Sequence, residues 1–172
     1  MPSTFNSGLI VLIPKVDHAD SITQFPPIAL TNFVFKIINP KILALRLASI
    51  AARIISPQQH AFVPGRHISD CILMTSECFN LLDSKCHGGN VAIKVDITKA
   101  FDTLSWGFLL HVLHAFGFHQ KNLHWVHALL RSAKLSLSIN GRSVGYFSCG
   151  RGVRQGDLLS PLLFCLAEEV LS

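Results

Sequence analysis

The chain has 172 residues, of which 49% are hydrophobic and 15% are charged, and its formal net charge is +5. This length and apolar content exclude a disordered chain and are typical of one folded unit with its own core. No apolar run reaches the roughly 18 residues that a membrane span requires, so we do not expect the chain to be a membrane protein. Its positive net charge favours a polyanionic partner.

The start of the chain and its cysteines bear on the cellular compartment. Residues 1–5 lack the basic and apolar segments of a secretory signal. The five cysteines are widely spaced and form no C-x-x-C pair, which is typical of reduced thiols rather than of a disulfide framework. We therefore expect an intracellular protein that is not secreted, in either the nucleus or the cytoplasm.

The first 30 residues predict two extended segments. Residues 8–13 are a β-rich run stopped by Pro14, which confines the strand to an edge or an end and leaves Lys15 in a loop. Lys15 is either a point charge for a triphosphate or an ordinary surface lysine. Residues 24–30 contain two prolines, and each residue before a proline is pushed towards an extended conformation.

Two helical patterns follow, separated by a loop. Residues 32–53 have mostly helical spacing of apolar positions, and Pro40 predicts two shorter helices or one kinked helix. Residues 55–66 are polar, are punctuated by proline and glycine and end in Arg66, so they form a loop. A second amphipathic helix runs from 69 to 82, with Ser69 or Asp70 as its cap.

The most informative stretch is the apolar run from Val91 to Val95, which is interrupted by Lys94 and followed by Asp96. It predicts a short buried strand with Asp96 at its C-terminal end and Phe101 close to the same pocket. Strand-end carboxylates suit nucleotidyl transfer, in which two magnesium ions roughly 3.5–4 Å apart activate the attacking hydroxyl and neutralise the leaving group. The simpler alternative is that Asp96 caps the following segment.

The second half predicts helices over residues 105–116 and 120–130, the first ended by Gly117, and a strand over 135–139 that enters a hairpin turn at Asn140-Gly141. Residues 151–164 combine arginines suited to phosphate, glycines that allow close backbone approach, and a Ser160-Pro161 pair that opens an apolar helix. Such a turn is either an anion platform or an ordinary helix start.

Together these stretches resemble the reverse transcriptase of non-LTR (LINE-type) retrotransposons, especially the plant kind. The matching stretches, in register, are residues 12–15, 25–30, 55–66, 94–106, 117–118, 140–141 and 151–164. The resemblance implies an α+β fold of the right-hand polymerase type, truncated before the second aspartate motif. Within one partial domain over 1–172, residues 1–90 would be fingers-like and 91–172 an incomplete palm.

The resemblance also implies roles for particular residues. Asp96 matches the first catalytic, metal-binding aspartate, and Phe101 matches the aromatic gate that would collide with a ribose 2′-hydroxyl. Lys15, Gln155 and Gly156 match positions that contact the incoming nucleotide.

Arginines extend the expected site towards nucleic acid, with Arg66, Arg151 and Arg154 as the candidate contacts. The chain departs from the family at Pro26, where an arginine is usual, and at Leu158, where a proline is usual. No Ala-Asp-Asp or Tyr-x-Asp-Asp stretch occurs anywhere in it.

The implied activity is RNA-directed DNA synthesis with Mg²⁺, and the implied partners are an RNA template, a DNA primer, deoxynucleoside triphosphates and the missing palm and thumb segments of a longer polyprotein. With one aspartate of the usual set, we expect this chain to be inactive alone. The alternatives are a non-catalytic RNA-binding remnant and a fragment with no selected function.

Overall fold

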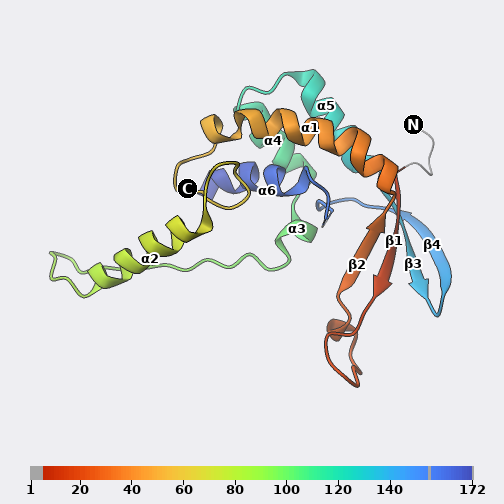
Figure 1. Cartoon of the computed structure of the whole chain (residues 1–172), viewed down its shortest axis with the longest axis horizontal. Helices are drawn as coiled ribbons and strands as arrows, with labels where there is room; N and C mark the ends of the chain where they lie inside the picture. Colours follow the sequence, from red (N-terminus) through yellow and green to blue (C-terminus); the bar gives the residue numbers. More distant parts are fainter. Residues whose placement is uncertain (1–5, 155, 172) are drawn as a thin grey trace.

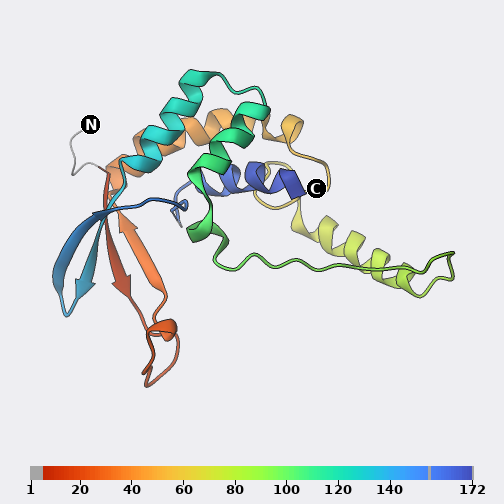
Figure 2. The same ribbon diagram turned by 180° about the vertical axis from the view of Figure 1, so that it is seen from behind.

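The computed structural model describes residues 6–154 and 156–171. A four-stranded sheet lies beside a group of helices, and one long arm projects from that group (Figures 1 and 2). The elements, in chain order, are β1 (Ser7–Leu12), η1 (Ile22–Gln24), β2 (Pro27–Thr31), α1 (Phe33–Ile54), α2 (Ile68–Leu82), α3 (Ala100–Thr103), α4 (Trp106–Ala115), α5 (Gln120–Arg131), β3 (Lys134–Ile139), β4 (Arg142–Ser148), α6 (Ser160–Glu168) and η2 (Glu169–Leu171).

The sheet has the strand order β2-β1-β3-β4. β1 pairs antiparallel with β2 and parallel with β3, and β3 pairs antiparallel with β4. Pro14 was expected to place β1 at an edge or an end of the sheet. The strand is interior instead. Pro14 permits this position because β1 ends at Leu12, so the proline lies beyond the hydrogen-bonded ladder.

α1 is a single helix that contains Pro40, so the alternative of two shorter helices is wrong. The side chain of Asn32 caps its start, because its Oδ1 accepts from the backbone N–H groups of Val34 and Phe35. Pro40 is among the most completely buried of the described residues. Its ring therefore packs inside the protein and does not face solvent.

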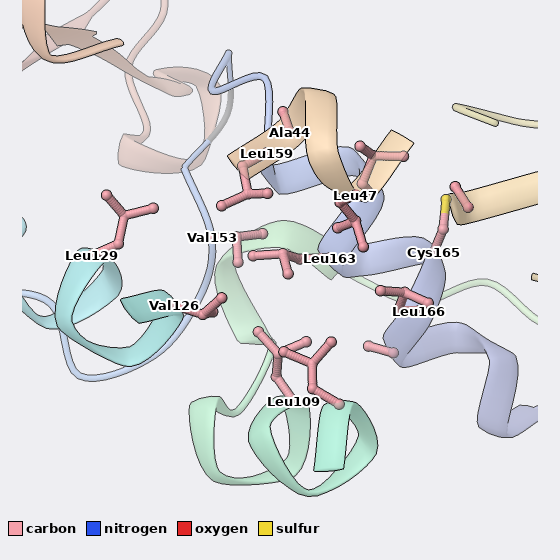
Figure 3. Close-up of a cluster of buried hydrophobic side chains, with 14 of the residues drawn as sticks. Ala44, Leu47, Leu109, Val126, Leu129, Val153, Leu159, Leu163, Cys165 and Leu166 are labelled. Carbon is pink, nitrogen blue, oxygen red and sulfur yellow. The ribbon is translucent and has the colours of Figure 1, made fainter. Parts of the chain in front are cut away.

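The core lies between α1, α4, α5 and α6 (Figure 3). It draws on both sides of residue 90, since Ala44 and Leu47 of α1 belong to the same cluster as Leu109 of α4 and Leu163 of α6. Leu109 and Leu166 are completely buried. Truncating a leucine in such a place costs about 2–5 kcal/mol, so these helices hold the domain together.

The elements predicted after residue 105 are confirmed. α4 and α5 lie where the helical spacing predicts them, and α6 begins at Ser160 with a proline in its first turn. Asn140 and Gly141 both have positive φ, of 50° and 75°, as a two-residue hairpin turn between β3 and β4 requires. None of the described helices is long and apolar enough to cross a membrane.

The expected buried strand before Asp96 is wrong. Residues 91–97 are extended but belong to no strand, and the side chains of Val91, Ile93 and Val95 are 82%, 83% and 72% exposed. A strand needs a partner for its backbone groups, and none of the described strands lies beside this segment. The apolar pattern is present, but these side chains face solvent.

The segment belongs to a projecting arm formed by residues 68–99, which comprises α2, a turn and the extended return (Figures 1 and 2). α2 has no buried residue, and its N-cap is His67, which lies two or three positions before the expected cap, Ser69 or Asp70. Asn90 closes the far end of the arm, because its Nδ2 donates to the backbone carbonyls of Leu81, Leu82 and Ser84.

Candidate nucleotide and nucleic-acid site

Backbone hydrogen bonds join two stretches that lie about 50 residues apart in the sequence. Gly152 N–H donates to the Leu104 carbonyl and Val153 N–H to the Phe101 carbonyl, both at 2.7 Å. Trp106 adds a third bond, since its Nε1–H donates to the Gly152 carbonyl at 2.7 Å. The segment after Asp96 and the arginine-rich turn therefore form one unit, as a site shared between them requires.

Gly152 makes this close approach possible. Its φ is +81°, and a Cβ added there would lie 2.6 Å from the Asp102 carbonyl oxygen and 2.9 Å from that of Phe101. Real Cβ atoms do not approach backbone oxygens so closely, and the conformation itself is unfavourable for any residue with a side chain. Glycine is therefore required at position 152 by both the backbone angle and the space.

Phe101 is held in place by α6. Its ring stacks on that of Phe164, with 5.0 Å between the ring centroids and 28° between their planes. The ring is half-buried and packs against the core, so one part of it remains accessible. Lys99 precedes α3 with a left-handed backbone (φ 51°, ψ 44°), and this turn carries the chain from the exposed segment into the core.

A cavity of about 230 Å³ lies where the sheet meets the helices. Its polar lining residues are Asn6, Asp102, Cys149, Arg151, Arg154, Asp157 and Ser160. Arg154 is half-buried and donates from Nη2 to the Asn6 carbonyl at 3.0 Å. Burial lowers the pKa of Arg154, and the charges of Cys149 and Asp157 oppose that shift. Arg154 thus helps to fix the cavity wall, whereas Arg151 is exposed at it.

Asn6 ties the start of β1 to the end of α5, because its Nδ2 donates to the Leu129 carbonyl at 3.1 Å and to Ser132 Oγ at 2.7 Å. Its Oδ1 is buried and accepts no hydrogen bond from the described residues. No pattern in the sequence marks Asn6, since its contacts span more than 120 positions. Trp106 lies within a recognisable motif, but only the fold shows what its indole N–H does.

Asp96 lies on the exposed segment before this site. Among residues 6–154 and 156–171, no group of three or more histidine, cysteine, aspartate or glutamate side chains could hold a metal ion. Magnesium keeps several of its waters and needs carboxylates together with substrate phosphates, so one exposed aspartate does not fit a two-metal centre. The described residues therefore do not complete such a centre.

Two of the other expected nucleotide contacts, Lys15 and Gly156, can be located in the structure. Lys15 is exposed in the loop that joins β1 and β2, as predicted, and its N–H donates to the Gln24 carbonyl at 2.9 Å. That loop extends from the sheet on the side away from the helices (Figure 1). Gly156 is exposed with a φ of +81°, next to the start of α6. Gln155 lies outside the described residues.

Arg66 has a structural role that the sequence did not reveal. Its Nη1 donates to the carbonyls of Ser56 and Gln59, and its Nη2 donates to those of Ala52 and Ile55. These carbonyls surround the C-terminus of α1, where four acceptors lack partners within the helix. Because its guanidinium is occupied by backbone, we do not carry Arg66 forward as a nucleic-acid contact.

Replacing Arg66 by methionine, which keeps much of the stem but removes the donors, is expected to lower the free energy of unfolding by about 2–3 kcal/mol. The reason is that several partly buried carbonyls lose charged donors at once. Urea unfolding measures this change, with Arg53→Met, at an exposed arginine in the last turn of α1, as the matched control. Equal stability of the two variants would show that the cap is unimportant.

A mixed α/β domain with a four-stranded sheet, in which a glycine-rich turn adjoins a cavity lined in part by two arginines, is consistent with a reverse transcriptase domain. Residues 13–172 match the sequence model of the family described as reverse transcriptase (RNA-dependent DNA polymerase). The chain therefore belongs to the reverse transcriptase family, as its motifs predict.

Within the family, its relatives are proteins of non-LTR retrotransposons. The Transposon TX1 uncharacterized 149 kDa protein of Xenopus laevis is 31% identical over 170 residues, which cover 98% of this chain and 13% of the relative. The Pol polyprotein of the retrotransposable element R2DM of Drosophila melanogaster is 31% identical over 172 residues, which cover 99% and 16%. An R2 Pol polyprotein of Nasonia vitripennis is 27% identical over 171 residues, which cover 99% and 16%.

The chain thus spans about a sixth of the length of these relatives or less. The relatives come from animals, so the plant-like qualifier stays a prediction.

Proposed function

We propose that this chain forms the fingers-like part and the first part of the palm of an RNA-directed DNA polymerase, divided near residue 90. The observation that carries the proposal is the backbone link from Phe101 and Leu104 to Val153 and Gly152. It brings the aromatic that follows the aspartate motif beside the glycine-rich turn, which is the pairing that a nucleotide pocket needs. Residues on both sides of position 90 contribute to one core. The proposed division therefore separates two functional regions and not two folding units.

In this proposal Phe101 meets the sugar of an incoming deoxynucleotide, and its stack on Phe164 keeps the ring from yielding to a 2′-hydroxyl. Gln155 and Gly156 line the template and nucleotide pocket. Arg151, exposed at the cavity, contacts the phosphate backbone of the RNA template or DNA primer. Lys15 is a triphosphate contact only if the β1–β2 loop reaches the site.

The family uses divalent metal ions, and we propose Mg²⁺, with Asp96 as one ligand. The other carboxylates come from outside the described residues, so the chain alone does not polymerise. The relatives' much greater length supports this, since they contain several times as many residues as the matched region.

The alternative of a non-catalytic RNA-binding remnant is less well supported. It relies on a basic face formed by Arg46, Arg53, Arg66, Arg151 and Arg154. Two of these arginines, Arg66 and Arg154, donate to backbone carbonyls instead. RNA affinity that falls steeply with salt and does not respond to magnesium would favour this alternative.

The test is primer extension on an RNA template with magnesium. The chain alone is compared with a chimera in which the residues that follow the matched region in the Drosophila R2 relative continue it. We expect the chimera to incorporate deoxynucleotides and the chain alone to incorporate none. Incorporation by the chain alone would contradict the claim that its metal site is incomplete, and an inactive, folded chimera would contradict the proposed function.

A further inference from the structure

The peptide group between Gly152 and Val153 is held at both of its polar ends. Its carbonyl, which belongs to Gly152, accepts from the indole Nε1–H of Trp106 at 2.7 Å. Its N–H, which belongs to Val153, donates to the Phe101 carbonyl, also at 2.7 Å. This one peptide group therefore connects the backbone of Phe101 to the side chain of Trp106.

The bond from Trp106 restricts a position that glycine leaves loose. Glycine at 152 permits the close approach to the Asp102 backbone, but it also has the widest range of backbone angles, so the peptide group after it turns easily. Turning that group would separate its carbonyl from the half-buried indole N–H, and both groups would lose a hydrogen bond. On the other side of the group, Val153 is 4% exposed and lies in the core cluster (Figure 3).

Trp106 is itself well fixed. It is the first residue of α4, whose N-cap Ser105 accepts at its Oγ from the Phe108 N–H. Its ring meets that of His127 on α5 edge to face, with 6.5 Å between the ring centroids and 72° between their planes. The indole donor is therefore held in one orientation by two helices that pack in the core.

Given the proposed function, we propose that Trp106 is a positioning residue that sets the selectivity for deoxynucleotides over ribonucleotides; this role exists only if Phe101 meets the sugar there. The stack on Phe164 holds the ring of Phe101, and the fixed peptide group holds its backbone. A ring that excludes a 2′-hydroxyl by collision is selective only while it cannot move aside. Trp106 acts on that ring through Gly152 and Val153 and makes no contact with the nucleotide.

The first test is the selectivity of the R2 chimera with Trp106→Phe, which keeps an aromatic ring at the start of α4 and removes the N–H donor. Selectivity is the ratio of kcat/KM for a deoxynucleotide to that for the matching ribonucleotide in primer extension on RNA. We expect this ratio to fall about three- to tenfold, as the loss of one hydrogen bond implies. The matched control is Trp125→Phe, the same change at the exposed second tryptophan of the chain, and it is expected to leave the ratio unchanged.

The ratio separates positioning from stability, because a variant that is only less stable incorporates less of both nucleotides alike. An unchanged ratio in an active Trp106→Phe chimera overturns this proposal and leaves the proposed function intact. An unmutated chimera that is folded but incorporates nothing contradicts the proposed function and this proposal with it.

Hydrogen exchange on the chain alone, followed by NMR, is a second measurement that needs no catalysis. Trp106→Phe is expected to speed amide exchange at Gly152 and Val153 about three- to tenfold and to leave that of Leu163 in α6 unchanged. Unchanged exchange at Gly152 and Val153 overturns the proposal, because the indole would then not hold the peptide group. Equal acceleration at Leu163 also overturns it, since the indole would then stabilise the fold in general.

Discussion

Asp96→Asn in the R2 chimera is expected to lower deoxynucleotide incorporation by at least about 10²–10³-fold. A metal ion stabilises the transition state by several kcal/mol, and each ~1.36 kcal/mol corresponds to tenfold in rate. Asparagine keeps the size and one oxygen of the side chain but removes the negative charge that Mg²⁺ requires. Since Asp96 is exposed and lies outside the core, we expect the fold to be unaffected.

Steady-state primer extension measures the loss, and circular dichroism confirms that the variant is folded. The matched control is Asp83→Asn, which makes the same chemical change at an exposed aspartate that ends α2. It is expected to retain full activity. Comparable activity of the Asp96 and Asp83 variants would show that Asp96 is not a metal ligand. The alternative that Asp96 caps the following segment is wrong, because the N-cap of α3 is Lys99 and no side chain caps that helix.

Gly152→Ala is expected to lower the free energy of unfolding by about 2–4 kcal/mol. The new Cβ would meet the Asp102 carbonyl at 2.6 Å while adopting a φ of +81°. Relief requires moving the turn, which breaks its hydrogen bonds to Phe101 and Leu104. Urea unfolding measures the change.

Two other glycines separate the causes. Gly65 has the same φ of +81° but no atom within 4 Å of its Cβ position, so Gly65→Ala reports backbone strain alone and is expected to cost about 1 kcal/mol. Gly150 has neither feature, and Gly150→Ala is expected to lie within about 0.5 kcal/mol of the original chain. If Gly152→Ala costs no more than Gly65→Ala, the close approach to Asp102 does not stabilise the fold.

Elements that depend on interactions between residues close in the sequence are predicted correctly, and those that depend on distant residues are not. The helices over 106–115 and 120–131 and the hairpin at Asn140-Gly141 depend on neighbours within a few residues, and their positions are confirmed. The strand over residues 91–95 is wrong, because a strand requires a neighbouring strand that a local pattern does not specify, and none of the described strands pairs with this segment. Arg66 shows the same limit for a site, since an arginine that ends a loop looks available until its carbonyl partners are known.

The sequence by itself determined the family, because motif residues such as Asp96 and Gly156 keep their order and spacing however the chain is folded. It also determined the local elements, through capping, proline and glycine chemistry and apolar period. Only the tertiary structure decided that Gly152 touches the Asp102 backbone, that Phe101 stacks on Phe164, and that Asn6 closes the cavity wall. These contacts join residues tens of positions apart, and no local pattern encodes a distance across space.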